Sequence, residues 1–248
     1  MTAAPAPAAP APPAIPLLAA RGLSAGYGSL AAVRDLDLHV DAGEVVALLG
    51  PNGAGKTTTL KTLAGALDPL AGEVLWKGRP TRAPLHRRSR RGLAYVPEER
   101  SVFMGLTAAE NLRVGDGPPE RALELFPELR PHLKRRAGLL SGGQQQILTL
   151  ARALASGPDV LLADELSLGL APLVVARLLE AVREAAGRGV GVLLVEQHAQ
   201  QALAVADRVY VLQRGRIALA GPAEEIRGRL DELERTYLAG PDADAGRS

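Results

Sequence analysis

Residues 50–57 read Gly50-Pro51-Asn52-Gly53-Ala54-Gly55-Lys56-Thr57, and this stretch decides the fold. It matches the pattern G-x-x-x-x-G-K-[ST] and lies between a predicted apolar strand, 44–49, and a predicted helix, 56–67. Glycines let successive backbone N–H groups point at phosphate oxygens, and the positive end of the helix adds to the field. Lys56 can reach the β and γ phosphates, while the Thr57 hydroxyl can bind Mg²⁺. The stretch, extended by Thr58, therefore predicts a nucleoside triphosphate site.

A second motif is the apolar strand 160–163, which ends in Asp164 and Glu165. A carboxylate at such a strand end can hold Mg²⁺ beside a phosphate loop, and we assign this role to Asp164. Glu165 is placed to orient or deprotonate an attacking water. Together with the phosphate loop, this pair predicts hydrolysis as well as binding.

Short apolar runs alternate with helical patterns along most of the chain, which favours an α/β fold with a mostly parallel sheet covered on both faces. The predicted strands are 17–23, 31–40, 44–49, 92–96, 160–163, 190–195, 209–213 and 216–219. The predicted helices are 56–67, 105–114, 119–133, 141–155, 172–188 and 201–205.

Composition excludes several classes of protein. The 248 residues contain no cysteine, so disulfides, thiolate catalysis and cysteine-bound metals are absent, and four histidines make a multi-histidine metal site unattractive. With 29 basic and 27 acidic residues the net charge is only +2, which does not indicate a nucleic-acid-binding surface. The arginine run Arg87, Arg88, Arg90 and Arg91 lacks aromatic companions, so we interpret it as a solvated helix face. No window reaches the roughly 18–20 apolar residues of a membrane helix.

Both ends differ in composition from the rest. Residues 1–16 contain six prolines and seven alanines, which no strand ladder or helix interior tolerates, so we expect a disordered tail. The segment lacks the basic start and apolar core of a secretory signal. Residues 240–248 are polar and are expected to be flexible. One domain, 17–239, remains between them.

The motif that separates families of phosphate-loop proteins is Leu140-Ser141-Gly142-Gly143-Gln144. Serine and two glycines opening a helix form a second anion-binding helix end. One nucleotide cannot easily use both loops of a single chain, whereas two chains meeting head to tail would each close the other's site. This segment resembles the signature of the ATP-binding-cassette (ABC) ATPases. The resemblance covers residues 17–238 and implies a mixed β core with a helical signature subdomain at about 98–156.

The resemblance assigns further residues. Tyr27 stands where the family has an aromatic residue that stacks on adenine, Glu98 where most members have the glutamine that touches Mg²⁺ or the attacking water, and Gln197 where most have a catalytic histidine. Ala171 replaces the usual aspartate after the acidic strand, and Leu166 replaces a proline.

The departures at Glu98, Ala171 and Gln197 are themselves similar to one subgroup, the smaller ATPase subunit of the bacterial high-affinity branched-chain amino acid importers; Leu166 departs from this subgroup too, where a proline is usual. The tracts that carry this likeness are Tyr95-Val96-Pro97-Glu98, Ser167-Leu168-Gly169-Leu170-Ala171-Pro172, Val195-Glu196-Gln197 and Arg235-Thr236-Tyr237-Leu238.

The subgroup implies an ATPase that uses ATP and Mg²⁺ and closes as a dimer with a second ABC ATPase subunit, identical or different. Its partners would be integral membrane permease subunits and, indirectly, a periplasmic substrate-binding protein, at the cytoplasmic face of the bacterial inner membrane. The helical subdomain would receive a short helix of the permease near Glu98, in a groove that Val102, Phe103, Met104 and Leu106 could line; internal packing of the subdomain is the equal alternative for these four residues.

Three alternatives stay open. A cassette ATPase that works on nucleic acid or ribosomes would need a second cassette or a long coiled-coil insertion, and 248 residues without heptads provide neither. A nucleotide-binding structural subunit that hydrolyses poorly is suggested by Glu98, Ala171 and Gln197. A transporter of other cargo, such as urea, other amino acids or lipopolysaccharide, is the third, since no residue of this chain would touch cargo.

Overall fold

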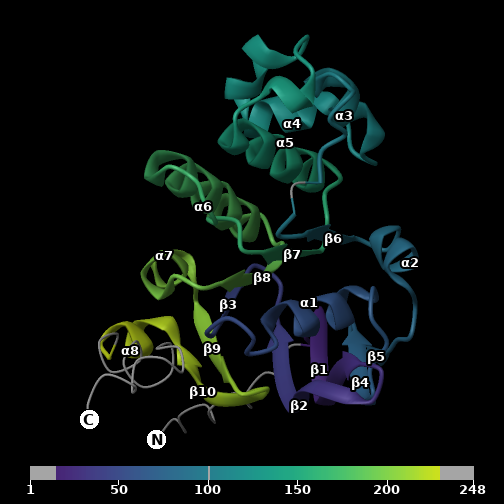
Figure 1. Cartoon of the computed structure of the whole chain (residues 1–248), viewed down its shortest axis with the longest axis vertical. Coiled ribbons are helices and arrows are strands. Elements are labelled where there is room, and N and C mark those ends of the chain that lie inside the picture. The colour runs from purple at the N-terminus through teal and green to yellow at the C-terminus, as the bar shows by residue number, and fades with distance from the viewer. Residues whose placement is uncertain (1–14, 100, 230–248) are drawn as a thin grey trace, which may run out of the picture.

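The strands of the computed structural model, which describes residues 15–99 and 101–229, form two sheets (Figure 1). The larger sheet has the order β10-β9-β3-β8-β7-β6 and the smaller one the order β2-β1-β4-β5. The larger sheet contains β3 (Val45–Leu49), β6 (Leu93–Val96), β7 (Val160–Asp164), β8 (Gly191–Glu196), β9 (Arg208–Gln213) and β10 (Arg216–Pro222). The smaller sheet contains β1 (Leu18–Tyr27), β2 (Leu30–Val40), β4 (Ala71–Trp76) and β5 (Arg79–Pro80).

The helices are α1 (Lys56–Ala64), α2 (Leu85–Ser89), α3 (Ala108–Val114), α4 (Pro119–Leu125), α5 (Gly142–Ala155), α6 (Pro172–Gly187), α7 (Ala199–Val205) and α8 (Ala223–Arg227), with the 3₁₀ turns η1 (Pro127–His132) and η2 (Ala137–Leu139). Helices α3, α4 and α5 gather at one end of the molecule, away from the smaller sheet (Figure 1).

The predicted α/β class is confirmed, with one correction to the sheet. Strands β6, β7, β8, β3 and β9 run parallel, as expected, but β10 pairs with β9 antiparallel and the smaller sheet is antiparallel throughout. The sequence pattern does not predict β4 or β5, because β4 opens with Ala71 and Gly72 and buries few side chains. The mixed β core implied by the family resemblance is therefore the better description.

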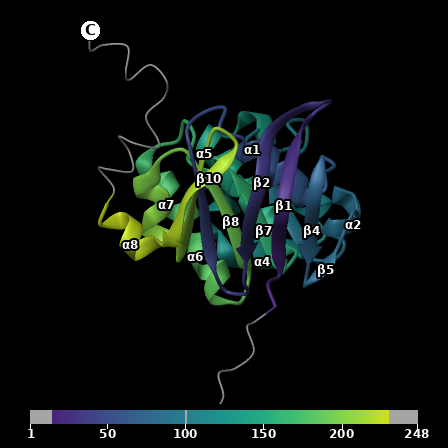
Figure 2. The ribbon, with the colours of Figure 1, turned by 90° about the horizontal axis from the view of Figure 1, so that it is seen from below.

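Helix α1, which carries the end of the phosphate loop, lies between the two sheets. One apolar cluster joins α1 to both sheets through residues such as Leu36, Val46 and Leu60. A second cluster, on the other face of the larger sheet, joins Val45 and Leu49 to the helices on that side. Figure 2 shows β2, β1 and β4 side by side with α1 behind them. Because β3 is buried on both faces, the loop that follows it is held rigidly.

Several helices are shorter than predicted, for local reasons. Helix α1 ends at Ala64 because Gly65 adopts a left-handed conformation, with φ at 80°. Helix α3 begins only after Thr107, whose side chain forms a capping box with Glu110. The predicted helix 119–133 breaks in two at Pro127, since a residue before proline avoids the helical region.

The predicted solvated arginine face is wrong at Arg88. This side chain is buried, and its guanidinium donates hydrogen bonds to the carbonyl oxygens of Thr62 and Leu63 at the end of α1. Its Nε donates to the Ala83 carbonyl oxygen at 2.7 Å. The interpretation holds for the exposed Arg87. A charge run in sequence does not reveal which of its members caps a helix elsewhere in the fold.

We expect Arg88→Ala to lower the free energy of unfolding by about 2–4 kcal/mol, because it strands several buried carbonyl oxygens that the guanidinium now satisfies. The neighbouring Arg87→Ala, a change at an exposed position, should cost less than about 0.5 kcal/mol. Urea unfolding of both variants checks this, and equal losses would contradict the capping role.

The predicted tails fall almost wholly outside the described residues. Of residues 1–16 only Ile15 and Pro16 are described, and 240–248 and the tract Arg235–Leu238 are not. The tail predictions and the likeness carried by that tract stay predictions.

Candidate functional site

The phosphate loop connects β3 to α1, as predicted. Gly53 and Gly55 have left-handed φ angles of 77° and 106°, which side-chain-bearing residues rarely adopt. At Gly50 an added Cβ would lie 2.4 Å from the Leu212 carbonyl oxygen, so β9 leaves no room for a side chain. Within the described part of the chain no side chain caps the start of α1, so its first N–H groups stay available. The loop thus has the geometry of an anion-binding helix start.

Lys56 is directed into this loop. Its ammonium group donates hydrogen bonds to the carbonyl oxygens of Gly50 at 2.9 Å and Pro51 at 3.3 Å. It also lies 3.5 Å from a carboxylate oxygen of Glu165, and the two side chains are only 5% and 11% exposed. A positive charge is therefore held at the loop, next to the carboxylate that the sequence predicts as the base.

Asp164 ends β7 as a buried carboxylate whose two oxygens accept no hydrogen bond of ordinary geometry from the described residues. Burial is the main reason that its pKa rises to about 6, and the nearby carboxylates of Glu165 and Glu98 add to the rise, while the Thr57 hydroxyl and Lys56 oppose it. An unpartnered carboxylate beside a hydroxyl is a hard-oxygen donor pair that fits Mg²⁺. Asp164 and Thr57 therefore suit the metal role predicted for them. Thr57 and Glu98 line one cavity, whereas the buried Asp164 is not among its lining residues.

A cavity of about 500 Å³ brings most predicted catalytic and phosphate-loop residues together; we call it the nucleotide cavity. It is lined by Ala32, Asn52, Gly53, Gly55, Lys56, Thr57, Thr58, Glu98, Glu165, Leu168 and Gln197. The strand register explains the convergence: Leu49 pairs with Glu196 and Asp164 pairs with Val195, so β3, β8 and β7 end at one edge of the sheet. Binding sites in such sheets lie at that edge.

Glu165 has a left-handed backbone, with φ at 45°, that turns its side chain back toward Lys56. Its N–H donates to the Val195 carbonyl oxygen at 2.9 Å, which ties the residue to β8. Strained backbone of this kind is frequent where a side chain must be held in one orientation.

The signature segment, Leu140–Gln144, does not line the nucleotide cavity of its own chain. Ser141 caps α5: the Gln144 N–H donates to its Oγ at 3.3 Å, and the Ser141 N–H donates to the Gln144 side chain at 3.0 Å. In Figure 1 α5 lies beside α3 and α4, apart from α1. This separation agrees with the expectation that the segment serves a second chain.

Tyr27 ends β1 with 58% of its surface exposed and is not among the residues that line the nucleotide cavity. Its adenine-stacking role stays a prediction. Three residues of this region escaped the sequence analysis as site residues. Ala32 on β2 and Leu168 in the loop after Glu165 line the cavity, and Glu196 is a buried carboxylate that ends β8. The available signal for Glu196 was an acidic residue at the end of an otherwise apolar strand.

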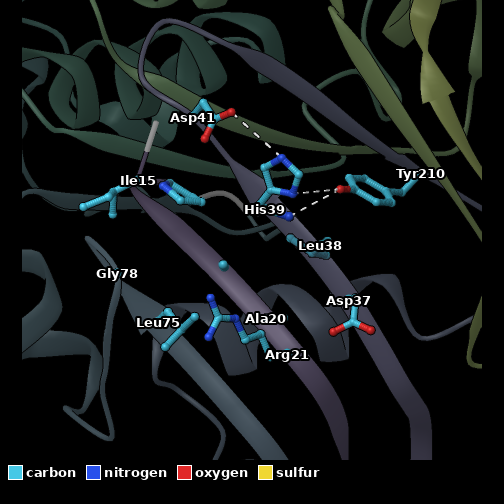
Figure 3. A pocket seen from close by; sticks show the side chains of 12 residues that line it. Ile15, Ala20, Arg21, Asp37, Leu38, His39, Asp41, Leu75, Gly78 and Tyr210 are labelled. Carbon is cyan, nitrogen blue, oxygen red and sulfur yellow. Dashed lines mark hydrogen bonds and ion pairs between the residues drawn. The ribbon is translucent and has the colours of Figure 1, made fainter. Parts of the chain in front are cut away.

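A larger cavity, about 760 Å³, lies against β1 and β2 (Figure 3). Three of its polar side chains pair with one another, since the His39 ring lies 3.9 Å from Asp41 and 3.4 Å from the Tyr210 hydroxyl. It lacks the phosphate loop and every predicted catalytic residue. The smaller cavity is therefore the candidate site.

Within 15–99 and 101–229 no helix is both long and apolar enough to cross a bilayer.

We expect Asp164→Asn to stabilise the nucleotide-free chain by about 2–3 kcal/mol at pH 7.5, because the amide removes a buried charge. A carboxyl whose pKa is raised on folding binds its proton more tightly in the folded state, so wild-type stability is lost as pH rises from about 4 through 6. The advantage of the variant should therefore shrink toward pH 4. Urea unfolding between pH 4.5 and 8 tests this, and a pH-independent difference would contradict it.

Comparison with known proteins agrees with the geometry. A family model described as "ABC transporter" matches residues 33–167, which include the phosphate loop, the signature segment and Asp164. The chain is 43% identical over 207 residues to the high-affinity branched-chain amino acid transport ATP-binding protein BraG of Pseudomonas aeruginosa, covering 79% of this chain and 89% of that protein. It is 39% identical over 221 residues to the lipopolysaccharide export system ATP-binding protein LptB of Acidithiobacillus ferridurans, covering 85% and 92%.

A solved structure described as the ATP binding subunit of an ABC transporter is similar with a TM-score of 0.74. It is 33% identical in sequence and covers 90% of this chain and 96% of its own.

Proposed function

The chain belongs to the ABC transporter family, and from that premise we propose that it is the ATPase subunit of a bacterial importer of branched-chain amino acids. Membership makes it an ATP-binding subunit and an ATPase whose hydrolysis is coupled to transport. The family and fold class predicted from the sequence are thereby confirmed. ATP-binding subunits of this family dimerise and work with membrane permease subunits.

One observation carries the proposed chemistry: four separate segments place Lys56, Glu98, Glu165 and Gln197 around one cavity at the edge of the larger sheet. In our proposal residues 50–58 bind the phosphates through the backbone and the Lys56 ammonium. Thr57 and Asp164 hold Mg²⁺, with Glu98 beside them; the ion would offset negative charge that develops on the phosphates. Glu165 takes the proton of the attacking water, and Gln197 orients that water.

Ser141, Gly142, Gly143 and Gln144 would complete the site of a second chain, because they lie outside the cavity of their own. Two subunits, identical or different, would then enclose two ATP molecules, and Tyr27 would stack on the adenine. Closure on ATP would move the attached permease subunits, and hydrolysis would release them.

The helical subdomain, about residues 98–156, is the part that we propose to contact the permease. Phe103 and Met104 are large apolar side chains that are 49% and 50% exposed, next to the Glu98 loop, whereas Val102 is buried. Exposed apolar side chains of this size suit an adaptable protein contact. The chain would thus sit at the cytoplasmic face of the inner membrane, with a periplasmic substrate-binding protein as an indirect partner.

The cargo rests on likeness to BraG, which is described as a branched-chain amino acid transport protein. The likeness to LptB gives lipopolysaccharide export as the second candidate. Glu98, Ala171 and Gln197 replace residues that most members of the family have, so a subunit of either system that hydrolyses ATP poorly is the further alternative.

Reconstitution in liposomes tests the cargo. With branched-chain importer permease subunits and a leucine-loaded binding protein, ATP turnover should rise several-fold above that with unloaded binding protein. Assembly with lipopolysaccharide export permeases, and none with the importer permeases, would overturn the proposal. Phe103→Ala/Met104→Ala should weaken assembly, while Leu173→Ala, at an apolar residue 86% exposed on α6, should not.

A further inference from the structure

The loop after the proposed base is held by a buried carboxylate. Glu196, at the end of β8, is 1% exposed. The Ser167 N–H donates to its Oε1 at 3.2 Å, and the Ser167 hydroxyl donates to its Oε2 at 2.7 Å. One side chain of β8 thus uses both carboxylate oxygens to hold one residue of the loop 165–171.

The two hydrogen bonds to Glu196 hold the loop between the proposed base, Glu165, and the cavity-lining Leu168. Glu165, two residues before Ser167, has a left-handed backbone, and Leu168, one residue after it, lines the nucleotide cavity. The loop is also tied by the Glu165 N–H to β8 and by the buried Leu166 side chain. Strained backbone persists only when its surroundings over-determine it, and the two bonds to Glu196 supply such a constraint.

Glu196 also precedes Gln197, which lines the same cavity. The two walls of the cavity that would contact an attacking water, Glu165 on one loop and Gln197 on the other, are therefore joined through Ser167 and Glu196. A displacement of one loop has to move the other or break two hydrogen bonds to a carboxylate.

Placing a carboxylate there costs free energy. Burial is the main cause that raises the pKa of Glu196 to about 7, and neighbouring Glu165 adds repulsion, while both Ser167 hydrogen bonds act in the opposite direction. An apolar residue would fill the position without this cost, but it could not accept from Ser167.

We propose that Glu196 is a positioning residue for ATP hydrolysis: by holding Ser167 it fixes the orientation of Glu165 and links it to Gln197. The inference rests on the proposed role of Glu165 as the base. It predicts an effect on the chemical step and little effect on nucleotide binding, because Glu196 is not among the residues that line the nucleotide cavity.

The test uses the full chain at concentrations that populate the dimer, with kcat, KM and the Kd for MgATP measured separately. Glu196→Ala should lower kcat about 10–100-fold and change KM and Kd by less than about threefold, as expected for a group that orients the base. Ser167→Ala should lower kcat less, since its N–H still donates to Glu196. Glu196→Gln should retain most of the activity, because its amide can still accept from the Ser167 N–H and donate to the hydroxyl.

Two controls complete the design. Gln200→Ala, an exposed change on α7, should leave kcat unaltered. The double variant Ser167→Ala/Glu196→Ala should be no slower than Glu196→Ala, since both changes break one connection.

Wild-type kcat in Glu196→Ala would overturn the inference. So would a loss of kcat matched by equal losses in MgATP binding and in folded protein, since that pattern marks a structural role. Glu165→Gln distinguishes the proposed role of Glu165 as the base from the proposed role of Glu196 as its positioning residue. Unimpaired turnover in Glu165→Gln would overturn the proposed base itself, whereas an inactive Glu165→Gln beside a normal Glu196→Ala would overturn only the positioning role.

Discussion

Exchanging Glu165 for glutamine is expected to lower ATP turnover by about 100-fold or more while ATP stays bound, since a positioned general base contributes about 10²–10⁴-fold to a rate. The amide keeps the size of the side chain but cannot take a proton from water. Loss of the negative charge also removes the carboxylate that competes with phosphate for the Lys56 ammonium, 3.5 Å away. ATP should therefore hold two subunits together, and size-exclusion chromatography with MgATP should show a dimer.

The matched control is Glu180→Gln, at an exposed carboxylate on α6 that lies outside the nucleotide cavity. It should hydrolyse ATP at the wild-type rate. Turnover in Glu165→Gln close to that of the control would remove Glu165 from the chemistry. If Glu165→Gln lost turnover and also formed no dimer with MgATP, the glutamate would instead be needed for closure of the dimer.

Replacing Lys56 by alanine is expected to weaken MgATP binding about 10–100-fold, because hydrogen bonds to charged groups contribute about 1.5–3 kcal/mol each. Turnover at saturating ATP should fall by a further factor of about 10²–10³, since the ammonium can also stabilise the charge that develops during transfer. The variant also leaves Glu165 without its positive partner in a largely buried position. Titration with a fluorescent ATP analogue and steady-state hydrolysis measure the two effects.

Lys61→Ala is the control for this change, because Lys61 lies on the same helix but does not line the cavity. It should alter neither the Kd nor kcat by more than about twofold. Equal defects in both variants would mean that α1 itself had been disturbed. An unchanged Kd in Lys56→Ala would contradict a phosphate contact.

The phosphate loop could be predicted because its chemistry is local. Eight consecutive residues carry the glycines, the lysine and the hydroxyl, and the strand and helix that hold them are the immediate neighbours. The pairing of Asp164 and Glu165 with that loop could be predicted for a related reason, since parallel strands end at a common edge. In both cases the position along the chain determines the position in space.

What could not be predicted depends on residues distant in sequence. In the sequence Arg88 does not differ from the neighbouring arginines. Only the fold shows that it binds the end of α1, at Leu63, which lies 25 residues earlier in the chain. Glu196 looked like the polar end of a strand until Ser167, 29 residues away, became its partner. Neither burial leaves a periodic or compositional signal, because both result from packing between elements and not from the local propensity of one.

The position of β3 also has a consequence for how the chain is made. This strand, residues 45–49, has β8 and β9 as its two neighbours, and these end at residues 196 and 213. During synthesis from the N-terminus, the ribosome has exposed the phosphate loop long before either neighbour exists. About 150 further residues must be synthesised before β8 is complete. At about 5–20 residues per second, this synthesis takes on the order of ten seconds. During that time β3, which is buried on both faces in the folded chain, lacks both neighbouring strands, and exposed apolar strands of this kind are prone to aggregation.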